Sequence, residues 1–325
     1  MFHSFKIVAL FIFLTSSIGV QAQNSTLKKQ VLTYPSRFSS VEALANKINA
    51  DFHSPEDKAK AAYVWMTHHI SYDVKGINKQ KRVAFKYSSE ADLKAQKKTF
   101  RKALALKTLK RKKAVCEGYS TLYKALCTHL NIECEMITGS SKTFISEIGN
   151  TRLPSNHAWN AIKLNGTWHL VDVTWGAGSV DYSQMRFRRS YNPSFFDTEP
   201  SDFIINHFPD KSQWQLLDQK MSIKDFGLQY QIFQAYWDSN IKLIAPQSGI
   251  LKHKKGENIQ FRIENLSPKS HIAYKYRNEK FGNRITVNRT DGICRFTVPM
   301  THLRKNELII YIDTKPALGF KCQRQ

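Results

Sequence analysis

The chain has 325 residues, 42% of them hydrophobic, and a formal net charge of +23. This length predicts two domains, and the hydrophobic content is typical of a folded globular protein rather than a disordered chain. Beyond the N-terminal segment no stretch approaches about 18 unbroken apolar residues, so no membrane span is predicted.

The N-terminal segment has the pattern of a secretory signal. Lys6 precedes an apolar stretch over residues 7–14, and Val20-Gln21-Ala22 provides a small-residue exit. This pattern predicts a cleaved signal peptide over residues 1–22 and an exported protein, periplasmic or extracellular. No cysteine lies near the exit, which argues against an attached lipid anchor.

Two helices with clear start signals follow. Ser39 with Glu42 reads as a capping box, and Ser54-Pro55 supplies a cap with a proline at the first helical position. The second helix is predicted to end near His69, and Tyr72 and Asp73 come directly after it. By their position alone, these two residues end the helix and cap a loop.

Residues 75–113 form a strongly basic tract, with 15 lysines and arginines against two acidic residues. Its middle part, residues 89–106, predicts an amphipathic helix. The tract is either a patch for an anionic surface, an acidic polymer or an acidic protein substrate, or simply the solvated face of a basic protein. Nucleic acid is not an expected partner, since export separates the two and no basic–aromatic module is present.

A single cysteine opens the next predicted helix. From Cys116 onward apolar residues recur at spacings of three and four, the period of one buried helical face. A helix N-terminus favours a thiolate, which is the nucleophilic form of cysteine. Gly118, within the first turn, leaves room for something to approach the sulfur. The alternative is that Cys116 only fills the core, as buried cysteines often do.

A tight hairpin is predicted around Asn165-Gly166, because a type I′ turn requires positive φ at both central positions. The two-residue loop pairs Ile162 with His169, Trp159 with Asp172, and His157 with Thr174. His157 and Asp172 then become diagonal neighbours on one sheet face. A carboxylate in that place can orient an imidazole toward a nucleophile, so Cys116, His157 and Asp172 are the candidate catalytic residues.

Three stretches carry a family resemblance: AVCEGYSTLYKALC, IECEMITG and NHAWNAIKLNGTWHLVDVTWGAG. They resemble the transglutaminase-like superfamily, in the branch similar to kyphoscoliosis peptidase, over roughly residues 38–217. The resemblance implies a papain-like α+β core, with helices packed on an antiparallel sheet and a Cys-His-Asp triad mapping onto Cys116, His157 and Asp172. It also implies that Tyr72 and Asp73 line the substrate cleft, and Gly118 and Trp159 are further substrate-binding candidates.

The expected chemistry is acyl transfer through a thioester, acting on peptide or glutamine-type amide bonds of a protein or peptide substrate. Water as acceptor makes the protein a peptidase or amidase, whereas a lysine amine makes it a cross-linking transglutaminase. The alternative is a non-catalytic envelope scaffold or binding protein that keeps the fold. No acidic cluster suggests a calcium site, so no metal and no cofactor are predicted.

The period of the apolar residues changes to two from about residue 238 onward. Strands are expected around Ile259–Ile263, Ile272–Tyr276, Ile285–Val287, Phe296–Val298 and Leu308–Ile312. We therefore predict a transglutaminase-like domain over residues 23–237 and a small immunoglobulin-like β-sandwich over residues 238–325.

The remaining cysteines and one further histidine also need an interpretation. If Cys116 stays free, the other four cysteines pair as Cys127 with Cys134 and Cys294 with Cys322, or remain buried thiols. His207 is predicted to be a structural histidine, because it has no strand-paired carboxylate.

Overall fold

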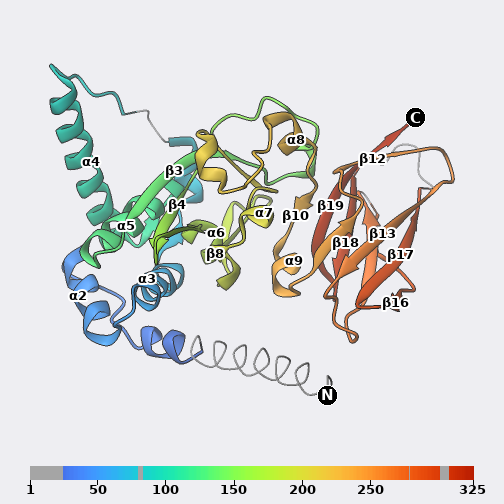
Figure 1. Ribbon diagram of the computed structural model, residues 1–325, viewed down its shortest axis with the longest axis horizontal. Helices are drawn as coiled ribbons and strands as arrows, with labels where there is room; N and C mark the ends of the chain where they lie inside the picture. Colours follow the sequence, from blue (N-terminus) through green and yellow to red (C-terminus); the bar gives the residue numbers. More distant parts are fainter. Residues whose placement is uncertain (1–24, 80–82, 278, 301–306) are drawn as a thin grey trace, which may run out of the picture. The chain divides into compact units, whose positions relative to one another are not determined.

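The computed structural model describes residues 25–79, 83–277, 279–300 and 307–325 (Figure 1). The predicted signal peptide lies outside these residues, so it remains a prediction. The chain divides into two compact units, the first comprising residues up to Met136 and Trp159–Phe196, and the second Ile137–Ala158 and Asp197–Gln325. The domain boundary predicted between residues 237 and 238 also remains a prediction.

The first unit is built around one helix, α5, which contacts α2, α3, α4 and α6. Its predicted apolar face is confirmed, since Tyr119, Leu122 and Leu126 are fully buried. The elements of this unit are α2 (Val41–Asp51), α3 (Pro55–His69), β1 (Ser71–Tyr72), α4 (Glu90–Arg111), β2 (Lys113–Ala114), α5 (Cys116–His129), α6 (Val173–Ala177), β6 (Gly178–Asp181) and β7 (Arg186–Arg189).

Helix starts in this unit follow side-chain capping. Ser54 accepts a hydrogen bond from the Asp57 amide at the start of α3, as predicted. Ser89 does the same for Asp92 at the start of α4. The predicted cap of α2 was wrong by one residue. Ser40 rather than Ser39 accepts the amide of Ala43, so Glu42 occupies the second helical position and no capping box forms.

Helix α4 packs into the core of its unit near its C-terminal end (Figure 1), while its middle contacts the preceding segment through Gln96 and Phe100. Its buried residues are Ala105, Thr108 and Leu109, whereas its first four turns bury none. The helix ends at Arg111 rather than near residue 106, because its last turn packs into the core.

A five-stranded sheet in the order β8-β5-β4-β3-β9 carries the predicted hairpin. The β4–β5 and β3–β9 pairs are antiparallel. The boundary between the two units falls within β3, β4 and β8. The strands are β3 (Cys134–Ser141), β4 (His157–Leu164), β5 (Thr167–Val171), β8 (Phe196–Thr198) and β9 (His207–Pro209).

The hairpin has the predicted register over its inner part. Leu164 pairs with Thr167, Ile162 with His169, and Asn160 with Val171. Asn165 and Gly166 have φ values of 50° and 85°, as a type I′ turn requires. The pairing ends at Val171, so the predicted pairs beyond it, Trp159 with Asp172 and His157 with Thr174, do not form.

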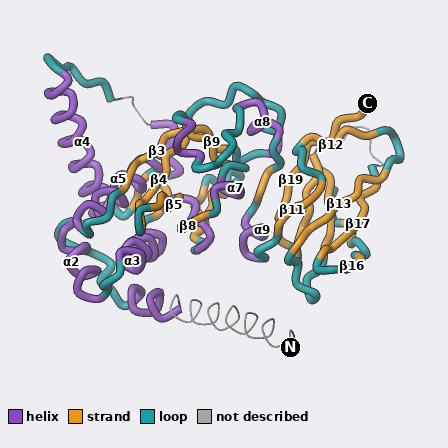
Figure 2. The backbone as a smooth tube through the Cα atoms, viewed as in Figure 1, coloured by secondary structure: helices purple, strands orange, loops and turns teal. Residues whose placement is uncertain are grey.

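The C-terminal part of the second unit consists of two sheets around an apolar core (Figure 2). One sheet has the order β10-β19-β18-β14-β15, with β12 parallel to β19, and the other has the order β11-β13-β17-β16. Their strands are β10 (Gln231–Ile232), β11 (Lys242–Ala245), β12 (Ile250–His253), β13 (Asn258–Glu264), β14 (Ile272–Tyr276), β15 (Asn283–Arg284), β16 (Asn288–Thr290), β17 (Ile293–Pro299), β18 (Glu307–Ile312) and β19 (Lys315–Arg324).

Four of the five predicted strands are present there, and one prediction was wrong. Ile285 and Val287 do not lie in a strand but in the connection from β15, in one sheet, to β16, in the other. Three short helices precede or join this part: α7 (Pro200–Phe203), α8 (Ile223–Leu228) and α9 (Gln234–Asp238). Among the described residues, no helix combines the length and the apolarity needed to cross a bilayer.

Candidate active site

Cys116 is the first residue of α5, as predicted. The preceding residue, Val115, has extended backbone, and its carbonyl accepts hydrogen bonds from the amides of Gly118 and Tyr119. The amides of Cys116 and Glu117 have no acceptor within the helix, because the first four helical N–H groups never do. The sulfur therefore lies at the positive end of the helix dipole, beside donors that can bind an oxyanion.

Gly118 has a packing reason for being glycine. A Cβ at this position would lie 2.6 Å from Cβ of Ala114 and 2.8 Å from Oγ1 of Thr108. The missing side chain lets α5 pass closely against β2 and the end of α4. Whether Gly118 also faces a substrate remains a prediction.

Asp172 follows β5 directly and is completely buried. Its Oδ1 accepts hydrogen bonds from the amides of Thr174 at 2.8 Å and Trp175 at 3.0 Å, which caps α6. This capping explains why the strand ends at Val171, since the chain turns into a helix as soon as the carboxylate can hold its first amides. The bonds also fix the direction in which the carboxylate points.

Tyr72, Cys116 and Asp172 lie together in the first unit. Tyr72 pairs with Ala114 in the short β1–β2 ladder, two residues before the cysteine. Burial raises the pKa of Tyr72, and electrostatic interaction with Cys116 and Asp172 raises it further. The predicted cleft residue Tyr72 is therefore within electrostatic reach of two of the three candidate catalytic groups.

Asp73 has the geometry of a loop cap. Its Oδ1 accepts the amide of Gly76 at 3.2 Å and lies 3.4 Å from Nζ of Lys113. Its own amide donates to the carbonyl of Ala114 at 2.8 Å, which extends the β1–β2 contact. Asp73 thus stabilises the segment before Cys116, and a role in substrate binding remains a prediction.

His157 is the first residue of β4, and His207 is the first residue of β9 in the same sheet. Both are buried, their ring centroids are 5.5 Å apart, and Phe203 stacks on His207 at 4.0 Å. The two histidines therefore lie side by side in the second unit. That the imidazole of His157 meets the carboxylate of Asp172, which belongs to the first unit, remains a prediction.

His207 is a neighbour of His157 that sequence reasoning did not predict. It was expected to be purely structural because no strand-paired carboxylate is evident near it. It lies near His157 in the sheet, and its own strand, β9, pairs with β3, about 70 residues earlier in the chain. Histidines are also ligands of zinc sites, so the prediction of no metal remains a prediction.

Arg189 of β7 is a second residue without a sequence signal. Its guanidinium donates to the carbonyls of Thr67 and Ile70 and to the hydroxyl of Ser71. The hydroxyl of Tyr119 in α5 donates to the same Ile70 carbonyl at 2.7 Å. Together these bonds tie the end of α3 and the start of β1 to α5, and so position Tyr72.

Trp159 is only 1% exposed, so its indole belongs to the core beside the hairpin. A role for it in substrate binding remains a prediction. All five cysteines are free and buried. Cys127 is in hydrogen-bonding contact with the thiol of Cys134, and burial raises the pKa of Cys127.

Two features define the class of protein. Helices pack with an antiparallel sheet, and a cysteine lies at the start of the central helix. Residues 42–173 match the sequence model of the transglutaminase-like superfamily, and this range contains Cys116, His157 and Asp172. The chain therefore contains a transglutaminase-like domain, as the sequence motifs predicted.

The curated relatives belong to the predicted branch. The chain is 30% identical over 231 residues to kyphoscoliosis peptidase of Mus musculus and 29% identical to that of Homo sapiens, covering 71% of this chain and 32% of each relative. A Lim and transglutaminase domain protein, ltd-1, of Caenorhabditis elegans is 25% identical over 286 residues, with 79% of this chain and 36% of the relative covered. The chain thus spans about a third of the length of these relatives.

Solved structures with similarity include a crystal structure of a TGase, 21% identical, covering 49% of this chain and 37% of that chain with a TM-score of 0.28. A titin I27 domain mutant, 14% identical, covers 26% of this chain and 90% of its own with a TM-score of 0.20. The predicted fold class is confirmed by the transglutaminase-like match over residues 42–173 and by the two packed sheets of the C-terminal part.

Proposed function

We propose that this protein is a cysteine-dependent acyl-transfer enzyme that acts on peptide or glutamine-type amide bonds. The observation that carries the proposal is the position of Cys116 at the start of α5, in a domain matched to the transglutaminase-like superfamily, with the buried carboxylate of Asp172 in the same compact unit. A cysteine that only filled the core would need neither the helix start nor a buried carboxylate nearby.

The proposed reaction starts with attack of the Cys116 thiolate on the carbonyl carbon of the amide. The C–S bond forms while the carbonyl π electrons move to oxygen, and the amide of Cys116 donates to that oxyanion. His157, oriented by Asp172, gives its proton to the leaving amine as the C–N bond breaks. A thioester remains on Cys116 and is resolved by water or by a second amine, with His157 accepting the proton of the attacking group.

Two acceptors define two activities. Attack by water gives a peptidase or amidase, and attack by a lysine amine gives a cross-linking transglutaminase. The basic helix α4 provides a surface to which we assign an acidic protein substrate or another anionic surface, since its first four turns are not buried. We further propose that the protein acts outside the cytoplasm, because residues 1–22 have the pattern of a signal peptide.

The test is incubation of the purified chain with a glutamine-donor peptide, with and without a labelled amine. Incorporation of the amine identifies a transglutaminase, and release of ammonia or a cleaved peptide without incorporation identifies a hydrolase. Neither product, together with retained folding, would overturn the proposal in favour of the non-catalytic scaffold.

A matched pair of cysteine variants shows whether a product depends on the proposed nucleophile. Cys116→Ala is expected to abolish thioester formation. Cys322→Ala changes a cysteine with the same 9% exposure in the β-sandwich and is expected to leave the activity unchanged. Equal activity in both variants would exclude Cys116 as the nucleophile.

A further inference from the structure

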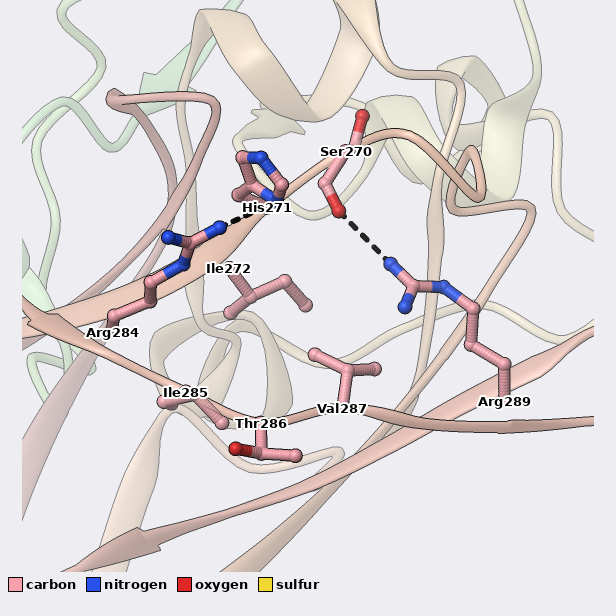
Figure 3. Close-up of a pocket in the computed structure, with 8 residues that line it drawn as sticks. All are labelled: Ser270, His271, Ile272, Arg284, Ile285, Thr286, Val287 and Arg289. Atoms are coloured by element: carbon pink, nitrogen blue, oxygen red, sulfur yellow. Dashed lines mark hydrogen bonds between the residues drawn. The ribbon is translucent and has the colours of Figure 1, made fainter.

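The β-sandwich contains a pocket of about 350 Å³ at one edge (Figure 3). It lies where the chain passes from β15, the last strand of one sheet, to β16, the last strand of the other. The residues that line it are Ser270, His271, Ile272, Arg284, Ile285, Thr286, Val287 and Arg289. The volume is sufficient for a small organic ligand.

Two arginines face each other across this pocket and are held by the segment before β14 (Figure 3). A guanidinium nitrogen of Arg284 lies 3.2 Å from Nδ1 of His271, and one of Arg289 donates to the carbonyl of Ser270 at 2.9 Å. Arginine can only donate, so Nδ1 of His271 accepts and the ring carries its proton on Nε2. Both arginine side chains are therefore held in place by one hydrogen bond each. Because a guanidinium has five N–H donors in total, donors are left for a ligand.

Neither guanidinium has a carboxylate partner among the ion pairs of the described residues. The acid that contacts the same segment is Asp313, whose oxygens accept from Oγ of Ser270 at 2.7 Å and from the His271 amide at 2.8 Å. The hydrogen bond from the His271 amide lowers the pKa of Asp313, so this carboxylate stays ionised. It stabilises the turn before β14 rather than pairing with the arginines. The arginines are left to bind an anion from outside.

Three apolar side chains lie beside the polar lining residues Ser270, His271 and Thr286. Ile272 is 1% exposed, and the partly buried Ile285 and Val287 pack against the sandwich core. A guanidinium binds carboxylate, phosphate or sulfate through paired N–H···O bonds, and an apolar surface beside it favours a ligand with an apolar body. The pocket thus combines the two features that an amphiphilic oxyanion requires.

Arginines at sheet edges also have a simpler use, because charge on an edge strand discourages pairing with another chain. That use requires exposure alone. It requires neither guanidinium groups held by hydrogen bonds nor an apolar floor between them. The observed arrangement has both, and so exceeds what edge protection needs.

We propose that this pocket binds a small organic oxyanion, with the charged group on Arg284 and Arg289 and the apolar part on Ile285 and Val287. This site is independent of the acyl-transfer chemistry proposed above. The shared ligand chemistry is a carboxylate, phosphate or sulfate group attached to an apolar body.

The test is calorimetric titration of the full chain with benzoate, phenyl phosphate and phenyl sulfate, beside inorganic phosphate and sulfate, at one ionic strength. At least one aryl anion is expected to bind saturably and at least tenfold more tightly than its inorganic counterpart. The aryl anion that binds best identifies the charged group. Equal affinity for aryl and inorganic anions, or no saturable binding, would overturn the proposal.

Variants separate a built site from general positive charge. Arg284→Gln with Arg289→Gln should weaken binding at least tenfold, whereas Lys252→Gln with Arg262→Gln, two exposed cations elsewhere in the sandwich, should leave it unchanged. Arg284→Lys keeps the charge but loses the paired donors, and an intermediate affinity is expected. Equal loss in both double variants would show attraction by net charge only, and thermal unfolding curves establish that each variant is folded.

Discussion

The two parts of this chain differ most in what they bury. Between residues 25 and 237 the described residues include 17 buried polar or charged side chains, whereas from residue 238 onward the one buried polar side chain is His253. Both parts have dense apolar cores with fully buried residues such as Leu122 and Phe261. The difference is therefore not in core packing but in the polar groups placed within it.

Burying polar groups costs free energy unless each finds a partner. The transglutaminase-like part accepts that cost for Asp172 and Lys142, and holds both with specific hydrogen bonds. The sandwich avoids the cost and places its arginines at the surface instead. This contrast agrees with the proposals made above, which assign the acyl-transfer chemistry to the first part and anion binding to the edge of the second.

The largest expected effect tests this contrast at Asp172. Asp172→Asn keeps an oxygen that can accept the amides of Thr174 and Trp175, but it removes the charge that orients the imidazole. We expect thioester formation to slow by roughly 10⁴-fold, with the unfolding midpoint little changed. The measurement is single-turnover acylation followed by mass spectrometry.

Asp291→Asn, an exposed position in the sandwich, is the control for that experiment and should acylate normally. If Asp172→Asn acylates as fast as the unmodified chain, the carboxylate serves only as the cap of α6 and the contrast between the two parts loses its chemical meaning.

The apolar core of the sandwich is tested by Phe261→Ala. Phe261 is fully buried and stacks on Phe296 at 5.1 Å, so its loss should cost about 3–5 kcal/mol in the free energy of unfolding. Phe281→Ala removes a ring that is 74% exposed and should change it by less than about 0.5 kcal/mol. Urea unfolding measures both, and similar costs would contradict the assigned core.

A pH-dependent effect is expected at Lys142, which is completely buried. Its amine donates to the carbonyls of Phe226 at 2.8 Å and Gln229 at 2.7 Å. Burial lowers its pKa from 10.5 to about 7, and only the charge of Glu147 opposes that shift. Between these two pH values the unfolded chain binds a proton that the folded chain does not, so this residue makes stability rise with pH.

The expected slope from Lys142 is about 1 kcal/mol per pH unit between pH 7 and 10. Lys142→Met should remove that slope, and Lys224→Met, at an exposed position in α8, should retain it. Unfolding free energies at pH 7, 8, 9 and 10 give the comparison. Parallel curves for the Lys142→Met variant and the unmodified chain would mean that the amine stays protonated when buried.

The smallest effect concerns the start of α2. Ser40→Ala removes the cap of the Ala43 amide and should cost about 1 kcal/mol, whereas Ser39→Ala should be nearly neutral. Both variants are measured by urea unfolding. A larger cost at Ser39 would restore the capping box predicted from the sequence.

Local signals in the sequence predicted much of the candidate site. The Asn165-Gly166 turn sets the hairpin register, and Ser54, Ser89 and Cys116 mark the starts of α3, α4 and α5. These features depend on hydrogen bonds between residues a few positions apart, so the residue types alone are informative. The family motifs added the expected catalytic residues.

The sequence by itself therefore determined the helix starts, the turn and the alternation of apolar residues, because each depends on short-range sterics and bonding. Only the tertiary structure decided that Asp172 caps α6, that His207 lies beside His157, and that Arg189 holds β1 to α5. The tertiary structure also decided that Ile285 and Val287 line a pocket instead of forming a strand. Those outcomes depend on which segments, distant in sequence, pack together, and no local pattern encodes that choice.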